Sequence, residues 1–429
     1  MLPIISAKNA AEIKTRLLLR AKGDFAAQET VVREVLHNIE TQGDEALFAY
    51  TRQFDEFDVT QDTVAVSEEE IRAAYDCVDA ELLDIMRESA QNIRAFHKMQ
   101  LRDDWCIEQD GKYLGQIYRP VERAGVYVPG GKAAYPSSVL MNVIPAQIAG
   151  VKHIYMATPA KNGKINPNTL VAAKEAGVEK IFKMGGAQAI AAFAFGTQSI
   201  PKVDTICGPG NIYVALAKKA VFGNVGVDMI AGPSEVMVIA DGSANPRYIA
   251  ADFLSQAEHD ELAACVLVTY SEQLAQTVRK EILRQTETLP KRAIVEKSLA
   301  RYGTIILAED EQDCVRVANE FAPEHLEICT EDPRETLKGV RNAGSVFLGE
   351  YSPEPLGDYF AGTNHVLPTN GTAKFSSPLS VDNFIKKSSV ICYTKEEFKK
   401  VYQKIRCFAQ AEDLCAHARS AAIRFEEIK

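Results

Sequence analysis

Short apolar runs that end in glycine or proline turns alternate with helix-like stretches from about residue 115 onward. Strand-like composition occurs in AGVYVPGG, HIYMATPA, KIFKMGGAQ and VDTICGPGN. A helical spacing of apolar residues occurs in TLVAAKEAG, QAIAAFAFG and NIYVALAKKAVFG. Such alternation indicates parallel strands in a sheet that is covered by helices. Because a second series of the same kind extends from SEVMVIAD to GSVFLG, the chain is predicted to contain two successive α/β units.

Length and periodicity divide the chain into four segments. A chain of 429 residues is too long for one ordinary hydrophobic core. The predicted segments are a helical N-terminal region (1–110), a first Rossmann-like α/β unit (111–235), a second such unit (236–378) and a short helical tail (379–429). Residues 350–380 are rich in Gly, Pro, Ser and Thr, so we predict a long functional loop there.

Charge and composition exclude several classes of protein. The net charge of −10 and the pI near 5.4 argue against nucleic acid or an anionic membrane as partner. The longest uncharged run, 133–151, contains two prolines, an asparagine and a glutamine, so we expect no membrane span. The first residues leave no room for the apolar core of a signal peptide, and nine cysteines without a C-x-x-C motif fit reduced thiols. We therefore expect a cytoplasmic protein.

The glycine-rich turns after the strands raise the hypothesis of a bound nucleotide. In α/β sheets, ligands bind at the carboxyl ends of the strands. However, GPGNIY lacks the third glycine of the dinucleotide fingerprint, and no G-x-x-x-x-G-K-[ST] motif occurs. Since a glycine after a strand more often serves a tight turn, these turns leave dinucleotide binding open.

Four polar residues raise the hypothesis of a metal site. Gln256 and His259 are three residues apart at the end of a predicted helix, so their side chains project from one face. With Asp358 and the distant His417, they would form a set of oxygen and nitrogen ligands that suits Zn²⁺ with open positions. The pair alone is more often a solvated helix end, and the spacing leaves open whether the four groups meet.

The stretch FAPEHLE places Glu324 and His325 side by side after a proline. Imidazole is matched to proton transfer near neutral pH, and a desolvated carboxylate becomes a stronger base because its pKa rises. The two residues are therefore candidates for an acid–base pair. Their position alone favours the other interpretation, which is a pair of polar residues on a surface loop.

Eight motifs, in order, give the chain its resemblance to the histidinol dehydrogenases over essentially its whole length. They are RAGVYVPGG, GGAQAIAAFAFGT, DTICGPGN, AGPSE, SQAEHD, FAPEHLE, GDYFAGTNHVLPT and AEDLCAHA. The resemblance implies oxidation of L-histidinol to L-histidine, the last step of histidine biosynthesis, by two NAD⁺ in succession through a bound aldehyde. It also implies a domain-swapped homodimer with one Zn²⁺ per subunit, in which residues 379–429 complete the site of the partner.

The same resemblance assigns roles to individual residues. As metal ligands it implies Gln256, His259, Asp358 and His417. As bases it implies His325, which takes the alcohol proton, and Glu324, which activates the water that adds to the aldehyde. As contacts to NAD⁺ it implies Tyr127, Gln188 and Asn211. As contacts to the substrate it implies Ser234, His365 and Glu412, together with His325 and the four metal ligands.

Two alternatives stay open. A related zinc- and NAD-dependent dehydrogenase could oxidise another small alcohol, such as a sulfonated diol, but the joint presence of Glu324, His365 and Glu412 favours histidinol. A non-catalytic metal- or nucleotide-binding protein could keep the same fold, but the intact pair of Glu324 and His325 argues against it.

Overall fold

The computed structural model describes residues 2–9, 12, 25–130, 134–230 and 232–426. It divides into two compact units, each of which is built from separate stretches of the chain. Unit 1 comprises the described residues up to Gln100 together with Val121–Phe384, and unit 2 comprises Leu101–Pro120 and the described residues from Ile385 onward.

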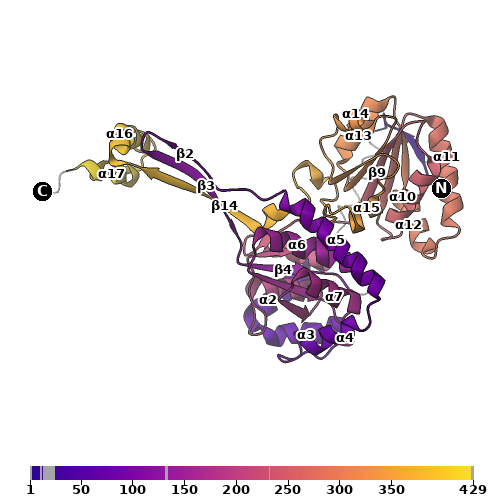
Figure 1. Cartoon of the computed structure of the whole chain (residues 1–429), viewed down its shortest axis with the longest axis horizontal. Helices are drawn as coiled ribbons and strands as arrows, with labels where there is room; N and C mark the ends of the chain where they lie inside the picture. The colour runs from indigo at the N-terminus through magenta and orange to yellow at the C-terminus, as the bar shows by residue number, and fades with distance from the viewer. Residues whose placement is uncertain (1, 10–11, 13–24, 131–133, 231, 427–429) are drawn as a thin grey trace. The chain divides into compact units, whose positions relative to one another are not determined.

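One sheet of unit 1 has six parallel strands in its described part. Their spatial order is β1 (Ile4–Ser6), β11 (Thr304–Leu307), β10 (Ala264–Thr269), β9 (Glu235–Ala240), β12 (His325–Cys329) and β13 (Ser345–Leu348). Every residue of β9, β10 and β12 is buried, because helices cover both faces (Figure 1). One face carries α10 (Pro246–Ala257), α11 (Glu272–Thr286) and α12 (Arg292–Tyr302); the other carries α13 (Glu311–Phe321) and α14 (Pro333–Leu337).

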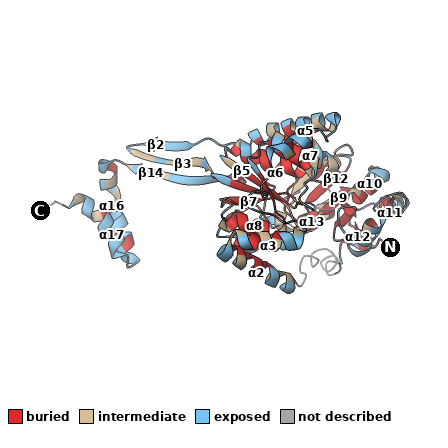
Figure 2. Cartoon of the chain, turned by 90° about the horizontal axis from the view of Figure 1, so that it is seen from below, coloured by how far each residue is buried: buried red, intermediate tan, exposed pale blue. Residues whose placement is uncertain are grey.

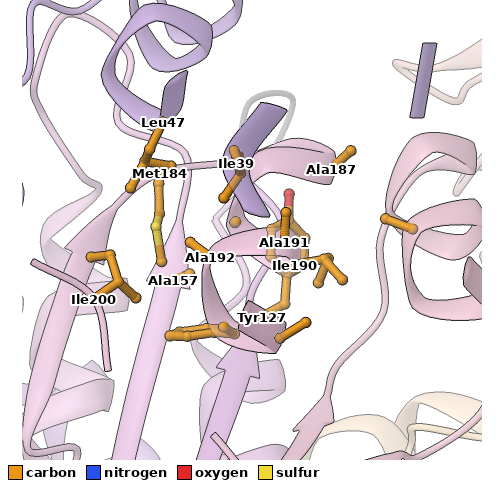
Figure 3. Packing of buried hydrophobic residues seen from close by; sticks show 14 of the residues in the cluster. Ile39, Leu47, Tyr127, Ala157, Met184, Ala187, Ile190, Ala191, Ala192 and Ile200 are labelled. Carbon is orange, nitrogen blue, oxygen red and sulfur yellow. The ribbon is translucent and has the colours of Figure 1, made fainter. Parts of the chain in front are cut away.

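The second parallel sheet of unit 1 has five strands in the described residues. Their order is β6 (Lys180–Lys183), β5 (His153–Thr158), β4 (Arg123–Tyr127), β7 (Thr205–Cys207) and β8 (Gly226–Val227). On one face lie α2 (Ala26–Gln42), α3 (Asp44–Asp55), α8 (Gly186–Phe195) and α9 (Ile212–Val221). The cluster under them includes Ile39, Tyr127 and Ile190 (Figure 3). Packed on β4 and β5 is α6 (Pro136–Ala149), which is flanked by α5 (Ala80–Lys98) and α7 (Pro167–Ala176), with α4 (Glu68–Tyr75) beside α7. Both sheets confirm the prediction of mostly parallel α/β architecture.

Unit 2 contains a three-stranded antiparallel sheet that was not expected from the sequence. It consists of β14 (Ile385–Tyr393), β3 (Lys112–Pro120) and β2 (Trp105–Gln109), followed by α16 (Lys395–Ala411), α17 (Cys415–Ala422) and η4 (Ile423–Phe425). The tail is therefore not purely helical, and the stretch before residue 110 ends in a strand. Both central residues of the β2–β3 turn, Asp110 and Gly111, have positive φ angles of 51° and 76°, which is the hairpin geometry that an Asp-Gly pair favours.

Residues 350–380 are not one continuous loop, contrary to the prediction. They contain α15 (Glu354–Tyr359) and η2 (Thr372–Lys374), and η3 (Val381–Phe384) follows. Pro353 and Pro355 suggested a loop, yet they lie at the start of α15, where a helix tolerates proline because its first N–H groups have no intrahelical acceptor. This short helix positions part of the candidate site.

Burial differs between the two units. The parallel strands of unit 1 are drawn mostly as buried, whereas β2, β14 and much of α16 and α17 are drawn as exposed (Figure 2). In the part of the chain that the structure describes, no helix combines the length and the apolar character needed to cross a membrane.

Candidate functional site

The main cluster of candidate residues lies at the amino ends of the strands in the six-stranded sheet. His325 is the first residue of β12, and Glu235 is the first residue of the neighbouring strand β9. Gln256 and His259 come to the same edge because α10 returns across the sheet after β9 and ends there. The candidate residues of this half of the protein therefore lie at the edge opposite to the carboxyl ends of the strands.

His325 has the geometry of a neutral base. Its side chain is 4% exposed, and its Nδ1 lies 2.9 Å from the carbonyl oxygen of Glu235. Because a carbonyl only accepts, Nδ1 carries the proton, and the lone pair of the neutral ring is on Nε2. Burial lowers the pKa of His325 to about 4. Among the described residues, Nε2 has no hydrogen-bond partner, and it lies 4.0 Å from Oδ1 of Asp358.

Glu324 is buried beside it and is fixed by the backbone of β9. Its Oε2 accepts a hydrogen bond of 2.7 Å from the N–H of Glu235, and its own N–H donates to the carboxylate of Glu235 at 3.3 Å. Burial raises the pKa of Glu324 well above its ordinary value. The interpretation of Glu324 and His325 as a surface pair is thus wrong, since both side chains are almost completely buried.

His259, Glu354 and Asp358 form a cluster that can hold a metal ion. One potential ligand atom from each residue lies within 4.8 Å of the other two. Gln256, which is 1% exposed, has an Oε1 atom without a hydrogen-bond partner in the described part of the chain. Gln256 lies three residues before His259 at the end of α10, and a buried, unpartnered carbonyl oxygen on this helix suits a divalent cation such as Zn²⁺. Burial also raises the pKa of Asp358 to about 6 and that of Glu354 to about 8.

His365 contacts a residue of this cluster, whereas Ser234 lies just before β9, beside the strand that carries His325. Nδ1 of His365 is 3.1 Å from the carbonyl oxygen of Asp358, and Nε2 is 3.1 Å from Oγ of Ser138 on α6. Burial lowers the pKa of His365 to about 4. Ser234 directly precedes β9, and its carbonyl oxygen accepts from the N–H of Ala264. His365 is thus hydrogen-bonded to the backbone of Asp358, which is one of the predicted metal ligands.

The predicted NAD⁺ contacts lie at the carboxyl edge of the five-stranded sheet. Tyr127 is the last residue of β4, and its hydroxyl accepts a hydrogen bond of 3.1 Å from the N–H of Gly186. Burial raises the pKa of this hydroxyl to about 12. Gln188 is buried in the first turn of α8, with its amide nitrogen 3.4 Å from the carboxylate of Asp55. Asn211 caps α9 by accepting from the N–H groups of the second and third helical residues.

Glu412 and His417 belong to unit 2, where both residues are exposed. Glu412 follows α16, and His417 lies on α17 beside an open hollow of about 620 Å³. The hollow is lined by Phe398, Ile405, Ala416, His417, Ser420, Ala421 and Arg424. Their assignment to the metal and substrate site stays a prediction.

Four residues near the candidate sites were not expected from the sequence: Asp55, Ser138, Glu235 and Glu354. The sequence could have indicated Glu354, because it precedes Asp358 by four residues, a spacing that places both side chains on one face of a helix. Glu235 acts on His325 through its backbone carbonyl, which no residue pattern reveals. Asp55 reaches Gln188 from α3, more than a hundred residues earlier.

Comparisons with known proteins agree with each other. The family model described as histidinol dehydrogenase matches residues 18–425 of this chain. A histidinol dehydrogenase of Halalkalibacterium halodurans is 55% identical over 402 residues, which cover 93% of this chain and 94% of the relative. One from Bacillus subtilis is 52% identical over 417 residues, which cover 96% and 97%. The crystal structure of histidinol dehydrogenase from Elizabethkingia anophelis superposes with a TM-score of 0.92 at 39% identity, over 99% of this chain and 97% of that chain.

Proposed function

This chain belongs to the histidinol dehydrogenase family and is an oxidoreductase, and from that premise we propose that it oxidises L-histidinol to L-histidine in two NAD⁺-dependent steps through a bound aldehyde. The observation that carries the proposal is the free Nε2 of His325, held by the Glu235 carbonyl and facing the candidate metal cluster at 4.0 Å from Asp358. A base in that position can take a hydroxyl proton from a substrate that is anchored by the cluster.

We assign His325 to proton removal from the alcohol. Its Nε2 accepts the hydroxyl proton while hydride leaves the carbinol carbon, and the Glu235 carbonyl stabilises the imidazolium that forms through Nδ1–H. Burial keeps the ring neutral in the resting enzyme, as its lowered pKa indicates. The base is therefore available before the substrate binds.

We assign Glu324 to the second step, in which water adds to the aldehyde. The aldehyde must become a hydrate before a second hydride can leave, so a proton has to be taken from that water. The raised pKa of Glu324 makes its carboxylate a stronger base than an ordinary glutamate. The backbone N–H of Glu235 fixes one of its oxygens, which leaves the other oxygen for the water.

One zinc ion per subunit is part of the proposal. The ligands in unit 1 would be Gln256, His259 and Asp358, and the unpartnered Oε1 of Gln256 supports this set. Zinc would supply a fixed anchor for the imidazole and amino nitrogens of the substrate, which keeps the aldehyde bound between the steps. Glu354 lies in the same cluster and, together with His365 and Ser234, would orient the substrate.

NAD⁺ would supply the hydride acceptor at the five-stranded sheet. Strands β4 and β7 are neighbours, so Tyr127 and the turn that ends at Asn211 lie at one edge of that sheet, which is the position where dinucleotides bind in parallel sheets. Gln188 lies at the start of α8, beside the same edge. The turn of this chain differs from the standard dinucleotide fingerprint, because its sequence is Gly-Pro-Gly.

We further propose a homodimer in the cytoplasm, with sites shared between subunits. Unit 2 would dock on the other subunit, so that Glu412 and His417 complete that subunit's substrate and zinc site. The exposure of both residues within unit 2 supports a role at an interface. The segments 1–110, 111–235, 236–378 and 379–429 remain our proposal for the functional division of the chain.

Two variants test the division of labour between the bases. Glu324→Gln should slow the conversion of aldehyde to acid far more than the first hydride transfer. His325→Asn should slow both half-reactions by roughly 10²- to 10⁴-fold. Turnover of histidinol and of histidinaldehyde is measured as NADH formation, with a sulfonated diol as the competing substrate. Equal damage to both half-reactions by Glu324→Gln would reject the assignment, and faster turnover of the diol would reject the substrate.

A further inference from the structure

A buried ion pair in the five-stranded half of unit 1 has no part in the chemistry proposed above. Nζ of Lys218 lies 2.5 Å from Oδ1 of Asp228, and the two side chains are 2% and 1% exposed. Lys218 lies on α9, and Asp228 directly follows β8. Removing two charges from water has a large free-energy cost, so such a pair contributes little net stability. Its position therefore calls for an explanation beyond stability.

Both members of the pair bind the same residue, Gly208. Nζ of Lys218 donates to the carbonyl oxygen of Gly208 at 2.8 Å, and the N–H of Gly208 donates to Oδ2 of Asp228 at 2.9 Å. The backbone of one glycine is thus held on its acceptor side by a cation and on its donor side by an anion. Hydrogen bonds to charged groups are roughly twice as strong as neutral ones.

Gly208 opens the turn 208–211, which joins β7 to α9 and ends at Asn211. Its φ angle is +114°, and a Cβ atom there would lie 2.0 Å from the carbonyl oxygen of Tyr127. A Cβ on Gly210 would lie 2.4 Å from a methyl carbon of Val214. Two of the four residues in the turn thus have no side chain with which to anchor it. Residues outside the turn must therefore hold its backbone in place, and Lys218 and Asp228 do so through their hydrogen bonds with Gly208.

We propose that Lys218 and Asp228 are positioning residues, which hold the turn 208–211 against Tyr127 in the conformation that receives NAD⁺. This inference rests on the proposed function, because it takes Tyr127 and Asn211 as contacts to the cofactor. The pair does not touch the cofactor; it acts through Gly208. A turn that is already in its binding conformation loses less conformational entropy when the ligand binds.

The test uses three variants and one control in the full-length protein. Lys218→Met removes the donor to Gly208 and leaves a buried carboxylate without its partner. Asp228→Leu removes the acceptor of the Gly208 N–H and leaves a buried ammonium without its partner. The double variant carries both changes and leaves no uncompensated charge. The control is Lys183→Met, which removes another poorly exposed lysine of the same sheet, paired with Glu70 at 2.6 Å and not bonded to the turn.

Two measurements follow the turn and the cofactor separately. Hydrogen exchange of the amides in residues 205–213, without cofactor, reports how firmly Lys218 and Asp228 hold Gly208; we call these contacts the clamp. Titration with NAD⁺ measures the affinity for the cofactor. If loss of the ion pair leaves the turn in its binding conformation for about a tenth of the time, Lys218→Met, Asp228→Leu and the double variant should bind NAD⁺ about 10-fold more weakly. Affinity for histidinol and zinc content should stay within about twofold, and Lys183→Met should resemble the wild type.

The double variant separates positioning from mere stability. If the pair only avoids a stranded charge, thermal stability and NAD⁺ affinity should both recover when both charges are removed, and this result would overturn the proposal. The proposal expects stability to recover while exchange at Gly208 stays fast and NAD⁺ affinity stays low. Wild-type protein that binds no NAD⁺ would refute the proposed function instead, and unchanged exchange in the variants would still refute the clamp.

Discussion

Glu327 should control the position of α15, and therefore of Asp358, without touching the substrate. It lies two residues after His325 on β12, so the two side chains point to the same face of the sheet. The Glu327 side chain is buried, and its Oε1 accepts a hydrogen bond of 2.9 Å from the N–H of Glu354, the first residue of α15. One strand thus carries both the proposed catalytic base, His325, and the side chain that fixes the start of the helix to which the proposed metal ligand Asp358 belongs.

The magnitude follows from the hydrogen bond that is lost. Glu327→Leu removes the acceptor and leaves the buried N–H of Glu354 unpaired, which costs about 1–3 kcal/mol. A shift of α15 moves Asp358 with it, and loss of such a supporting contact typically lowers metal affinity or activity by about 10- to 100-fold. Glu327→Gln is the matched control, because its amide oxygen can still accept from Glu354. We expect the Gln variant to stay close to the wild type.

The assay is competition between the protein and a chelator for Zn²⁺, together with kcat/KM for histidinol and thermal unfolding of the metal-free protein. The Leu variant should release zinc at a lower chelator concentration and unfold at a lower temperature. Zinc affinity at the wild-type level in the Leu variant would refute the reasoning. Damage of equal size in the Gln variant would also refute it, since the acceptor would then not be the cause.

Three further outcomes are expected. Stripping zinc with a strong chelator should abolish activity, and Mn²⁺ or Co²⁺ should restore it because no thiolate is among the proposed ligands; activity that survives complete loss of the metal contradicts this. Co-expression of His259→Ala and His417→Ala should give mixed dimers with about a quarter of all sites intact, and absence of any regained activity refutes shared sites. Hydrogen bonds from Arg87 lower the pKa of Glu175 below its ordinary 4.5. The stability that these bonds contribute is therefore fully present above about pH 4.5. It is lost as the pH falls through the lower pKa that Glu175 has in the folded protein. Because Arg87 is partly exposed and solvent screens the pair, Glu175→Gln should cost up to about 1 kcal/mol at pH 7 and flatten the acid side of the stability profile; an unchanged profile of thermal unfolding against pH contradicts this.

The parallel sheets were predictable because their strands are continuous apolar runs. EVMVIA of β9 and ACVLVT of β10 are buried along their whole length, and only a strand with both faces covered needs such a composition. The antiparallel sheet of unit 2 lacks that signal, since all residues of β2 are exposed. The Asp110–Gly111 pair marks its hairpin locally. Nothing in the sequence near the hairpin indicates β14 as the third strand.

The candidate site was predictable where the residues share one element and not where they meet through the fold. Gln256 and His259 were found from helical spacing, and the structure keeps them together at the end of α10. The helix that carries Glu354 was missed because its prolines resemble a loop. The contact between His325 and the Glu235 carbonyl depends on the register of β12 against β9. Register between distant strands is a property of the topology, which one sequence does not reveal.

The discontinuous origin of unit 2 has a consequence during synthesis on the ribosome. The β2–β3 hairpin is complete at Pro120, but β14, which pairs along the whole of β3, begins only at Ile385. At ordinary translation rates, the roughly 265 residues between them take about 15 to 50 s to synthesise. During that time the edge of β3 exposes unpaired backbone groups, which are a template for pairing with other chains. The nascent protein should therefore depend on chaperones most strongly in this interval, and release from them should coincide with the emergence of the last fifty residues.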